Sequence, residues 1–239
     1  MKASIVLATY KEKENIVKLI KSILENCKKD KLPCEIIVVD DNSPDGTAEA
    51  VKKAYGKNKD VKLIVRTNEK GLGTAVGRGV KESTGDVLVF MDSDFSHDPA
   101  DIPKMAKLAK DYEIVNGSRH IKGSYIKTTW FRKLATLLLR IYMSLVLQLN
   151  ITDYTNGYIV VRKSVLNKLD IGKIFYGYGD YYFRLFYYSV KGTGAKIKEV
   201  PVYYKFREAG ESKTNFIKHG WQYATAALKL RFGRYREPH

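Results

Sequence analysis

Two aspartates separated by one residue, Asp92 and Asp94, have the type and spacing that most directly suggest chemistry. They follow Val87–Met91, an apolar run that predicts a buried strand of a parallel sheet. The carboxylates would then lie at the carboxyl end of that strand, where open α/β sheets bind ligands. Two hard anionic ligands suit a divalent cation that keeps waters and binds substrate phosphates. The pattern points to phosphate or sugar-nucleotide chemistry; the alternative is a pair of solvated carboxylates at a strand end.

The residues that follow this pair could support the same cation. Ser96 is a candidate weak contact to the metal or to its waters. His97 and Asp98 come next, and either could hold the ligands in place without touching the cation.

A second acidic pair, Asp40 and Asp41, also follows an apolar run, Glu35–Val39. A carboxylate at a strand end can accept hydrogen bonds from a nucleobase N–H or a ribose hydroxyl, so we predict base and ribose recognition here. The alternative is a tight turn followed by a helix cap, because Asp, Asn and Ser are common in both.

The segment Asn68–Gly79 is rich in glycine, but its spacing is not that of a dinucleotide-binding loop. Small residues there would allow either the close approach of a diphosphate or the close packing of a helix. The sequence leaves both interpretations open.

The elements that must position these motifs alternate between strand and helix. We expect strands at Ser4–Ala8, Glu35–Val39, Val61–Val65, Val87–Met91 and Glu113–Asn116. We expect helices at Glu14–Leu24, Thr47–Ala54, Gly73–Lys81 and Ile102–Lys110. The alternation predicts an α/β fold in which helices flank a mostly parallel sheet with right-handed crossovers.

The chain is basic, with 42 Lys and Arg against 26 Asp and Glu among 239 residues and a formal charge of +16. Its charge favours anionic partners such as nucleotides, nucleic acid or a phospholipid surface. No acidic residue occurs at 114–152 or 212–236, so the chain divides into a metal-and-substrate half and a basic, apolar half.

Leu134–Ile151 is almost continuously apolar, and three interpretations compete for it: a buried helix, an interfacial helix lying on a membrane, and a transmembrane helix. The charged Arg140 near its middle argues against a span. Trp221–Phe232 also has an amphipathic pattern.

Together, six segments resemble the GT-A glycosyltransferases of family 2, specifically the dolichyl-phosphate mannose synthases and related polyprenyl-phosphate glycosyltransferases. In family order they are ATYKE (8–12), DDNSPDGT (40–47), KGLGTA (70–75), MDSDFSHDP (91–99), GSR (117–119) and VPVYYKFREAGESK (200–213). The resemblance implies a GT-A (Rossmann-like) fold and inverting transfer of mannose from GDP-mannose to dolichyl (polyprenyl) phosphate, with Mg²⁺ or Mn²⁺ on the donor diphosphate. A different donor, such as UDP-glucose, or a different acceptor is the alternative.

The resemblance also implies site residues. Asp92 and Asp94 would engage the metal with Ser96 beside them, and the two aspartates, Arg119 and Arg132 would form the catalytic group. The implied nucleotide-sugar site comprises Ala8, Tyr10, Glu12, Asp40, Asp41, Lys70, Gly71, Asp92, Ser93, Asp94, Arg207 and Lys213. We expect one domain over 1–239, with the nucleotide-sugar and metal half at 1–119 and a basic, amphipathic acceptor half with interfacial helices at 120–239.

Three departures from the family pattern leave donor and acceptor identity open. Ala8 and Lys11 stand where the family commonly has Pro and Asn, and Thr155–Tyr158 replaces a Ser-Gly-Phe-like turn. Near Gly179 a glutamate-bearing helix is replaced by GDYYFRLFYY, so Arg184 or Leu185 falls about where the acid is expected, and Asp180 is a candidate to compensate for its loss.

The expected location is cytoplasmic, peripheral on the cytoplasmic face of a membrane, with a membrane-protein partner as one way to reach it. The start of the chain lacks a signal-peptide pattern, and Cys27 and Cys34 are expected as free thiols. A nucleic-acid-binding module would explain the charge but not the Asp92/Asp94 pair, so nucleic acid is not an expected partner. A nucleotide-sugar-binding protein without catalytic activity is a third class.

Overall fold

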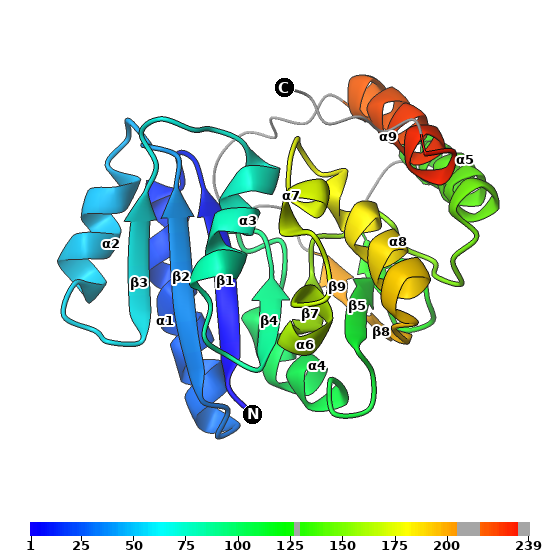
Figure 1. Cartoon of the computed structure of the whole chain (residues 1–239). Coiled ribbons are helices and arrows are strands. Elements are labelled where there is room, and N and C mark those ends of the chain that lie inside the picture. The colour runs from blue at the N-terminus through cyan, green and yellow to red at the C-terminus, as the bar shows by residue number, and fades with distance from the viewer. Residues whose placement is uncertain (127–129, 205–215, 234–239) are drawn as a thin grey trace.

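The framework of the computed structural model is a seven-stranded sheet in the order β3-β2-β1-β4-β7-β5-β8 (Figure 1). The structure describes residues 1–126, 130–204 and 216–233, without the side chains of 126, 131–132 and 216–219. The strands are β1 (Ala3–Thr9), β2 (Cys34–Asp40), β3 (Val61–Val65), β4 (Val87–Phe90), β5 (Ile114–Ser118), β7 (Ile159–Arg162) and β8 (Ile197–Pro201). Only β7 is antiparallel to its neighbours, β4 and β5, so the predicted mostly parallel sheet is confirmed.

Helices cover both faces of this sheet (Figure 1). One face carries α1 (Lys13–Lys29), α2 (Thr47–Tyr55) and α4 (Ile102–Leu108), the last preceded by a short 3-10 turn at Pro99–Asp101. The other carries α3 (Leu72–Glu82), α6 (Lys163–Leu166), α7 (Ile171–Ile174) and α8 (Tyr181–Thr193). The described elements thus form three layers, the arrangement that buries both faces of a parallel sheet.

Strand β4 shows why the apolar runs become buried strands. Val87 and Val89 belong to the hydrophobic cluster under α1 and α4, whereas Leu88 and Phe90 belong to the cluster under α3 and α8. Because successive side chains of a strand point to opposite faces, a run without polar residues is stable only where both faces are covered. The strand ends where Asp92 begins the polar loop.

The long apolar segment forms most of α5 (Trp130–Leu147), which packs against α9 (Phe216–Arg231) beyond α8 (Figure 1). The Tyr142 hydroxyl donates to the Ala224 carbonyl at 2.9 Å and joins the two helices. Met143 is fully buried, whereas Leu145 is 72% exposed. One side of α5 therefore belongs to the core and the other forms an apolar stripe. Among the described helices, none has the length and hydropathy needed to cross a membrane.

A two-stranded parallel ribbon lies outside the main sheet. It pairs β6 (Tyr125–Ile126) with β9 (Tyr203–Tyr204), and the rings of Tyr125 and Tyr203 stack at 4.7 Å between centroids. The ribbon ties the chain after β5 to the chain after β8.

Candidate active site

Within the described part of the chain, the residues predicted for the nucleotide and the metal lie at the carboxyl edge of the sheet. The Ser93 hydroxyl donates to the Ala8 carbonyl at 3.1 Å and so joins the loop after β4 to the end of β1. The Gly71 N–H donates to Asp41 Oδ2 at 2.7 Å and joins the loop before α3 to the end of β2. The fold therefore assembles in space what the sequence spreads over more than eighty residues.

Asp40 is fully buried and its carboxylate holds the turn after β2. Its Oδ1 accepts from the Ser43 N–H at 2.8 Å, and its Oδ2 accepts from the hydroxyls of Thr9 at 2.8 Å and Ser43 at 2.7 Å. Both oxygens are thus engaged inside the protein. This arrangement fits the alternative interpretation, a structured turn, better than direct contact with a base.

Asp41 is held by an arginine that sequence reasoning missed, Arg66, whose side chain is 5% exposed. The Arg66 Nε–H donates to Asp41 Oδ1 at 2.7 Å, and the Arg66 Nη2 group donates to the Gly71 carbonyl at 2.9 Å. The guanidinium therefore orients the acid and the loop before α3 together. Its position one residue after an apolar strand is the only sequence signal for this role.

The glycines of α3 allow a close approach of protein to protein. A Cβ on Gly73 would lie 2.4 Å from the Tyr176 carbonyl oxygen, and one on Gly77 would lie 2.9 Å from the Phe175 Cβ. The Gly73 N–H also donates to the Gly177 carbonyl at 3.0 Å. At these two positions the structure favours the helix-packing interpretation, because the turn after α7 occupies the space that a side chain would take.

Tyr10 and Glu12 follow β1 and differ in exposure. The Tyr10 ring is 39% exposed, with the ammonium groups of Lys11 and Lys70 at 5.6 and 5.9 Å from its centroid. Glu12 accepts from the Asn15 side chain at 3.0 Å, and its N–H donates to the Thr47 hydroxyl. An exposed ring with two cations near it is a surface on which a base could stack beside its phosphates.

The loop that carries Asp92 and Asp94 has oxygen donors of the kind that Mg²⁺ and Mn²⁺ bind. Asp92 Oδ2 lies 3.5 Å from the Ser96 hydroxyl, and Asp94 Oδ1 accepts from the Ser96 N–H at 3.0 Å. The described residues contain no cluster of three or more His, Cys, Asp or Glu side chains able to hold a metal. Two carboxylates and a hydroxyl fit a cation that takes its remaining ligands from a diphosphate and water.

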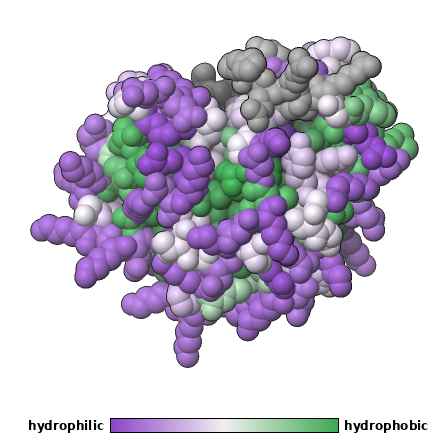
Figure 2. All heavy atoms as spheres, in the orientation of Figure 1, coloured by the Kyte–Doolittle hydropathy of each residue, from purple (hydrophilic) through white to green (hydrophobic). Residues whose placement is uncertain are grey.

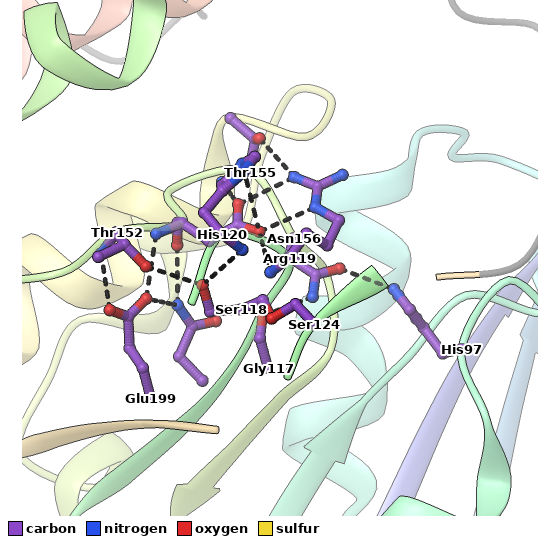
Figure 3. Close-up of polar contacts among 12 residues, drawn as sticks. His97, Gly117, Ser118, Arg119, His120, Ser124, Thr152, Thr155, Asn156 and Glu199 are labelled. Atoms are coloured by element: carbon purple, nitrogen blue, oxygen red, sulfur yellow. Dashed lines mark hydrogen bonds and ion pairs between the residues drawn. The ribbon is translucent and has the colours of Figure 1, made fainter. Parts of the chain in front are cut away.

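Arg119 follows β5 and is fixed by Asp153, which sequence reasoning missed. Its Nε–H and Nη2–H donate to the two Asp153 oxygens at 2.8 and 2.9 Å, and Nη2 also donates to the Thr155 hydroxyl at 2.9 Å (Figure 3). Such a bidentate pair fixes the plane of the guanidinium. Asp153 had one sequence signal, because it is the first acid after the acid-free stretch at 114–152.

The charges of this pair stabilise each other. Burial favours the neutral acid, but the attraction of Arg119 and its hydrogen bonds outweigh burial and hold the pKa of Asp153 at about 2. Burial likewise opposes the charged guanidinium, yet Asp153 raises the pKa of Arg119, and the more distant Asp92 carboxylate adds to the rise. Asp92 therefore acts on Arg119 across the site.

Glu199 on β8 supports the segment that carries Asp153 (Figure 3). It accepts the N–H groups of Thr152 at 2.7 Å and Asp153 at 3.0 Å, and the Asn116 amide at 3.2 Å. Burial raises the pKa of Glu199 despite these bonds. Glu199 on β8 thus holds one short segment in place and links it to Asn116 on β5.

Three predicted basic residues cannot be placed. Arg207 and Lys213 lie outside the described residues, and so does the side chain of Arg132, whose backbone is in the first turn of α5. Their assignment stays a prediction.

Arg184, one of the two residues expected at about the place of the family's acid, is fully buried in α8. Its Nε–H donates to the Ile174 carbonyl at 2.8 Å, and its other nitrogens bind Asp180 and the Tyr176 carbonyl. The negative charge of Asp180 is therefore compensated by Arg184 within the protein. The suggestion that Asp180 replaces the missing acid now has to account for this ion pair.

The fold belongs to a known class. The structure of glucosyl-3-phosphoglycerate synthase from Mycobacterium tuberculosis, solved with Mn²⁺, UDP and glucosyl-3-phosphoglycerate, superposes with a TM-score of 0.74 and covers 96% of this chain and 80% of its own. The same enzyme with Mn²⁺ and UDP-glucose gives a TM-score of 0.72. At 19% identity these likenesses establish the GT-A fold alone.

The chain belongs to glycosyl transferase family 2, whose model matches residues 4–170. It is 38% identical to dolichol-phosphate mannosyltransferase of Pyrococcus furiosus over 89% of this chain and 59% of that protein. It is 33% identical to undecaprenyl-phosphate mannosyltransferase of Micrococcus luteus over 89% of this chain and 87% of that protein. The Saccharomyces cerevisiae dolichol-phosphate mannosyltransferase is 38% identical over 53% of this chain, which spans 48% of it.

Proposed function

We propose that this chain transfers mannose from GDP-mannose to a polyprenyl phosphate of the dolichyl type, with inversion at the anomeric carbon. The observation that carries the proposal is that the loop with Asp92 and Asp94 follows β4 and Arg119 follows β5, two strands whose carboxyl ends lie at the same edge of the sheet. Relatives named for mannosyl transfer to dolichol phosphate or undecaprenyl phosphate match 89% of the chain, which supports this substrate class.

In this proposal the chain binds and positions two anionic substrates. A lipid phosphate is ionised near pH 7 and needs no general base, so positioning and charge compensation supply most of the rate. Arg119, with its plane fixed by Asp153, would orient a phosphate. Tyr10, Lys70 and the Asp41–Gly71 loop would hold the nucleoside diphosphate.

Asp92 and Asp94, with Ser96 beside them, would hold Mg²⁺ or Mn²⁺. Such a cation neutralises charge that develops on the leaving nucleoside diphosphate. The chain's own contribution is to carry two carboxylates in the loop that follows β4, at the same edge of the sheet as Arg119.

The acceptor half would lie on a membrane through α5 and α9. An outward apolar stripe runs along both helices, and Figure 2 shows apolar atoms at this corner of the molecule. Its exposed members are Trp130, Leu134, Leu137, Leu138, Ile141, Leu145, Trp221, Leu228 and Phe232. Exposed Lys133 and Lys229 lie on the same helices, and apolar side chains beside basic ones are typical of helices that lie on anionic membranes. We place the two halves, 1–119 and 120–239, in one domain on the cytoplasmic face.

Replacing Leu145 by glutamate is expected to weaken binding to vesicles of anionic phospholipid by roughly tenfold or more. Leu145 is 72% exposed in the protein, so its burial in a membrane would contribute about 1.5–3 kcal/mol to binding. The substitution removes this contribution and adds a negative charge that anionic lipid repels. Vesicle co-sedimentation measures the loss. Val65→Glu is the matched control, because Val65 is 43% exposed on β3, away from α5 and α9. Equal losses in both variants would contradict the membrane-facing role of α5.

Arg119→Ala and Arg132→Ala are each expected to reduce transfer more than donor binding, because both residues are assigned to the reacting phosphates. Titration with GDP-mannose and Mn²⁺ gives donor affinity, and product formation gives transfer. Arg119→Lys, which keeps the charge next to buried Asp153 but not the planar fork, separates orientation from charge. Equal losses of binding and transfer would move these arginines to the donor site.

A different donor is the second candidate. It is favoured by the change of sequence in the helix near Gly179, where Asp180 is paired with Arg184. The deciding experiment offers labelled GDP-mannose or UDP-glucose with Mg²⁺ or Mn²⁺ and polyprenyl phosphate in vesicles. Lipid-linked mannose from GDP-mannose supports the proposal. Lipid product from UDP-glucose alone would replace the donor, and metal-dependent hydrolysis without lipid product would replace the acceptor.

A further inference from the structure

A buried histidine and a buried asparagine connect the aspartate loop to β5, the strand that Arg119 follows. The Asp92 N–H donates to His97 Nδ1 at 3.0 Å, and His97 Nε2 lies 2.8 Å from Asn156 Oδ1. The Asn156 amide nitrogen donates to the Gly117 carbonyl at 2.5 Å (Figure 3). His97 and Asn156 are each 1% exposed, so water does not compete for these bonds.

The chain of hydrogen bonds has only one consistent direction. A backbone N–H can only donate, so Nδ1 of His97 must be an acceptor, and the neutral ring then carries its hydrogen on Nε2. That hydrogen needs an acceptor, which Asn156 Oδ1 supplies. If the Asn156 amide were flipped, its NH₂ group would face the N–H at His97 Nε2, and its oxygen would face the Gly117 carbonyl oxygen. Residue 156 must therefore accept from His97 and donate to Gly117, which a carboxamide does.

The same contacts fix the loop that holds the two acids. Phe95, in the middle of that loop, has a positive φ of 62°, a conformation that costs a residue with a side chain about 1 kcal/mol or more. The His97 ring stacks on Tyr158 with centroids 4.8 Å apart, and the Tyr158 hydroxyl donates to the Asp98 carbonyl at 2.7 Å. The loop is thus anchored at both ends, at the Asp92 N–H and at the Asp98 carbonyl.

The position of Asn156 explains how it reaches both sides. Strand β7 lies between β4 and β5, so the segment entering β7 passes between the loops that follow those two strands. Within that segment Asp153 and Thr155 bind Arg119, and Asn156 binds His97. The same segment is where the sequence departs from the Ser-Gly-Phe-like turn of the family. A serine side chain is shorter than the Asn156 carboxamide, which reaches both His97 and Gly117.

We propose that Asn156 is a positioning residue that sets the tautomer of His97 and, through it, the place of Asp92 relative to Asp94. The inference rests on the proposed function, because it treats the two aspartates as the cation site. In metal sites, loss of a partner behind the ligands typically lowers metal affinity about 10–100-fold. In this proposal Asn156, a residue at which the chain differs from the family pattern, supports the cation site.

The test compares the native chain with Asn156→Leu, which has nearly the same volume and no hydrogen-bonding atom, and with the exposed, distant Asn167→Leu. Ring ¹⁵N NMR without metal, assigned with His97→Gln, should show one His97 tautomer, protonated at Nε2, in the native chain and in Asn167→Leu. The Asn156→Leu spectrum should lose that single-tautomer signature. Mn²⁺ titration at fixed GDP should then show about 10-fold or weaker affinity in Asn156→Leu alone.

An unchanged Mn²⁺ affinity in a folded Asn156→Leu chain would overturn the inference, as would a native ring protonated at Nδ1. If that variant does not fold, Asn156→Ala, whose side chain also has no hydrogen-bonding atom, replaces it with the same expected losses. Asp94→Ala distinguishes the two proposals. If it binds Mn²⁺ as the native chain does, the proposed metal site is wrong, whereas loss in Asp94→Ala with full affinity at Asn156→Leu rejects only the role of Asn156.

Discussion

Replacement of Asp94 by alanine is expected to abolish metal-dependent donor binding and to reduce transfer by about a thousandfold or more. The Asp94 carboxylate is 3% exposed and lies in the loop after β4, where two acids one residue apart repel each other unless a cation neutralises them. A bound divalent cation contributes several kcal/mol to a charged transition state, and each 1.36 kcal/mol is about tenfold in rate. Calorimetric titration with GDP-mannose, with and without Mn²⁺, measures the loss of binding.

Two further substitutions separate charge from structure. Asp94→Asn keeps an oxygen that can accept the Ser96 N–H and should preserve the loop, yet it should lose the cation as fully as Asp94→Ala does. Asp30→Asn, at the end of α1, removes the same charge at the opposite edge of the sheet and should change neither binding nor transfer. Transfer by Asp94→Ala at the native rate would show that Asp94 is not a metal ligand.

Replacement of Arg184 by methionine is expected to have the largest effect on stability, lowering the free energy of unfolding by about 3–5 kcal/mol. The substitution leaves Asp180 without its cation and removes the donors to the carbonyls of Ile174 and Tyr176. The guanidinium also lies over the Tyr176 ring, 3.6 Å from its centroid. Urea unfolding of the folded variant measures the change.

Arg78→Met is the matched control for this prediction. Arg78 also forms an ion pair four residues along a helix, with Glu82, but its side chain is 50% exposed. Exposed pairs of this kind contribute about 0–1 kcal/mol. If both variants lost the same stability, the burial of Arg184 would not be what makes its contacts important.

The clamp formed by Arg184 also bears on the site, because the turn it holds packs against α3. The Gly177 carbonyl of that turn accepts the Gly73 N–H at 3.0 Å, next to Gly71 and the Asp41–Arg66 pair. Two buried arginines therefore hold the segments beside the predicted nucleotide site. Arg66 holds Asp41 and the loop before α3, and Arg184 holds the turn that packs against α3. Sequence reasoning identified neither as a clamp, because Arg66 binds groups on other elements and Arg184 binds the carbonyls of Ile174 and Tyr176, which only the fold of the turn before α8 brings to it.

The sequence predicted the first half of the fold well and the second half poorly. The predicted strand Val61–Val65 is confirmed to the residue, and Glu14–Leu24 lies within α1. Strand β7 was not predicted, because Ile159–Arg162 is a four-residue segment with only three apolar residues and no periodicity to distinguish it from a helix or a loop. Helix α8 is apolar on nearly every side and was noted only as a departure from the family.

The sequence by itself determined that acids end two buried strands, because an apolar run and the polar residues that stop it are adjacent in the chain. It also determined the alternating order that places those strand ends on one edge. Only the tertiary structure decided which groups hold those acids. Asp41 meets Arg66 across 25 residues, Asp153 meets Arg119 across 34, and Asn156 meets His97 across 59. The first pairing depends on β3 lying beside β2, and the other two depend on β7 entering the sheet between β4 and β5. That order of strands is decided by packing over the whole molecule and is written in no local pattern.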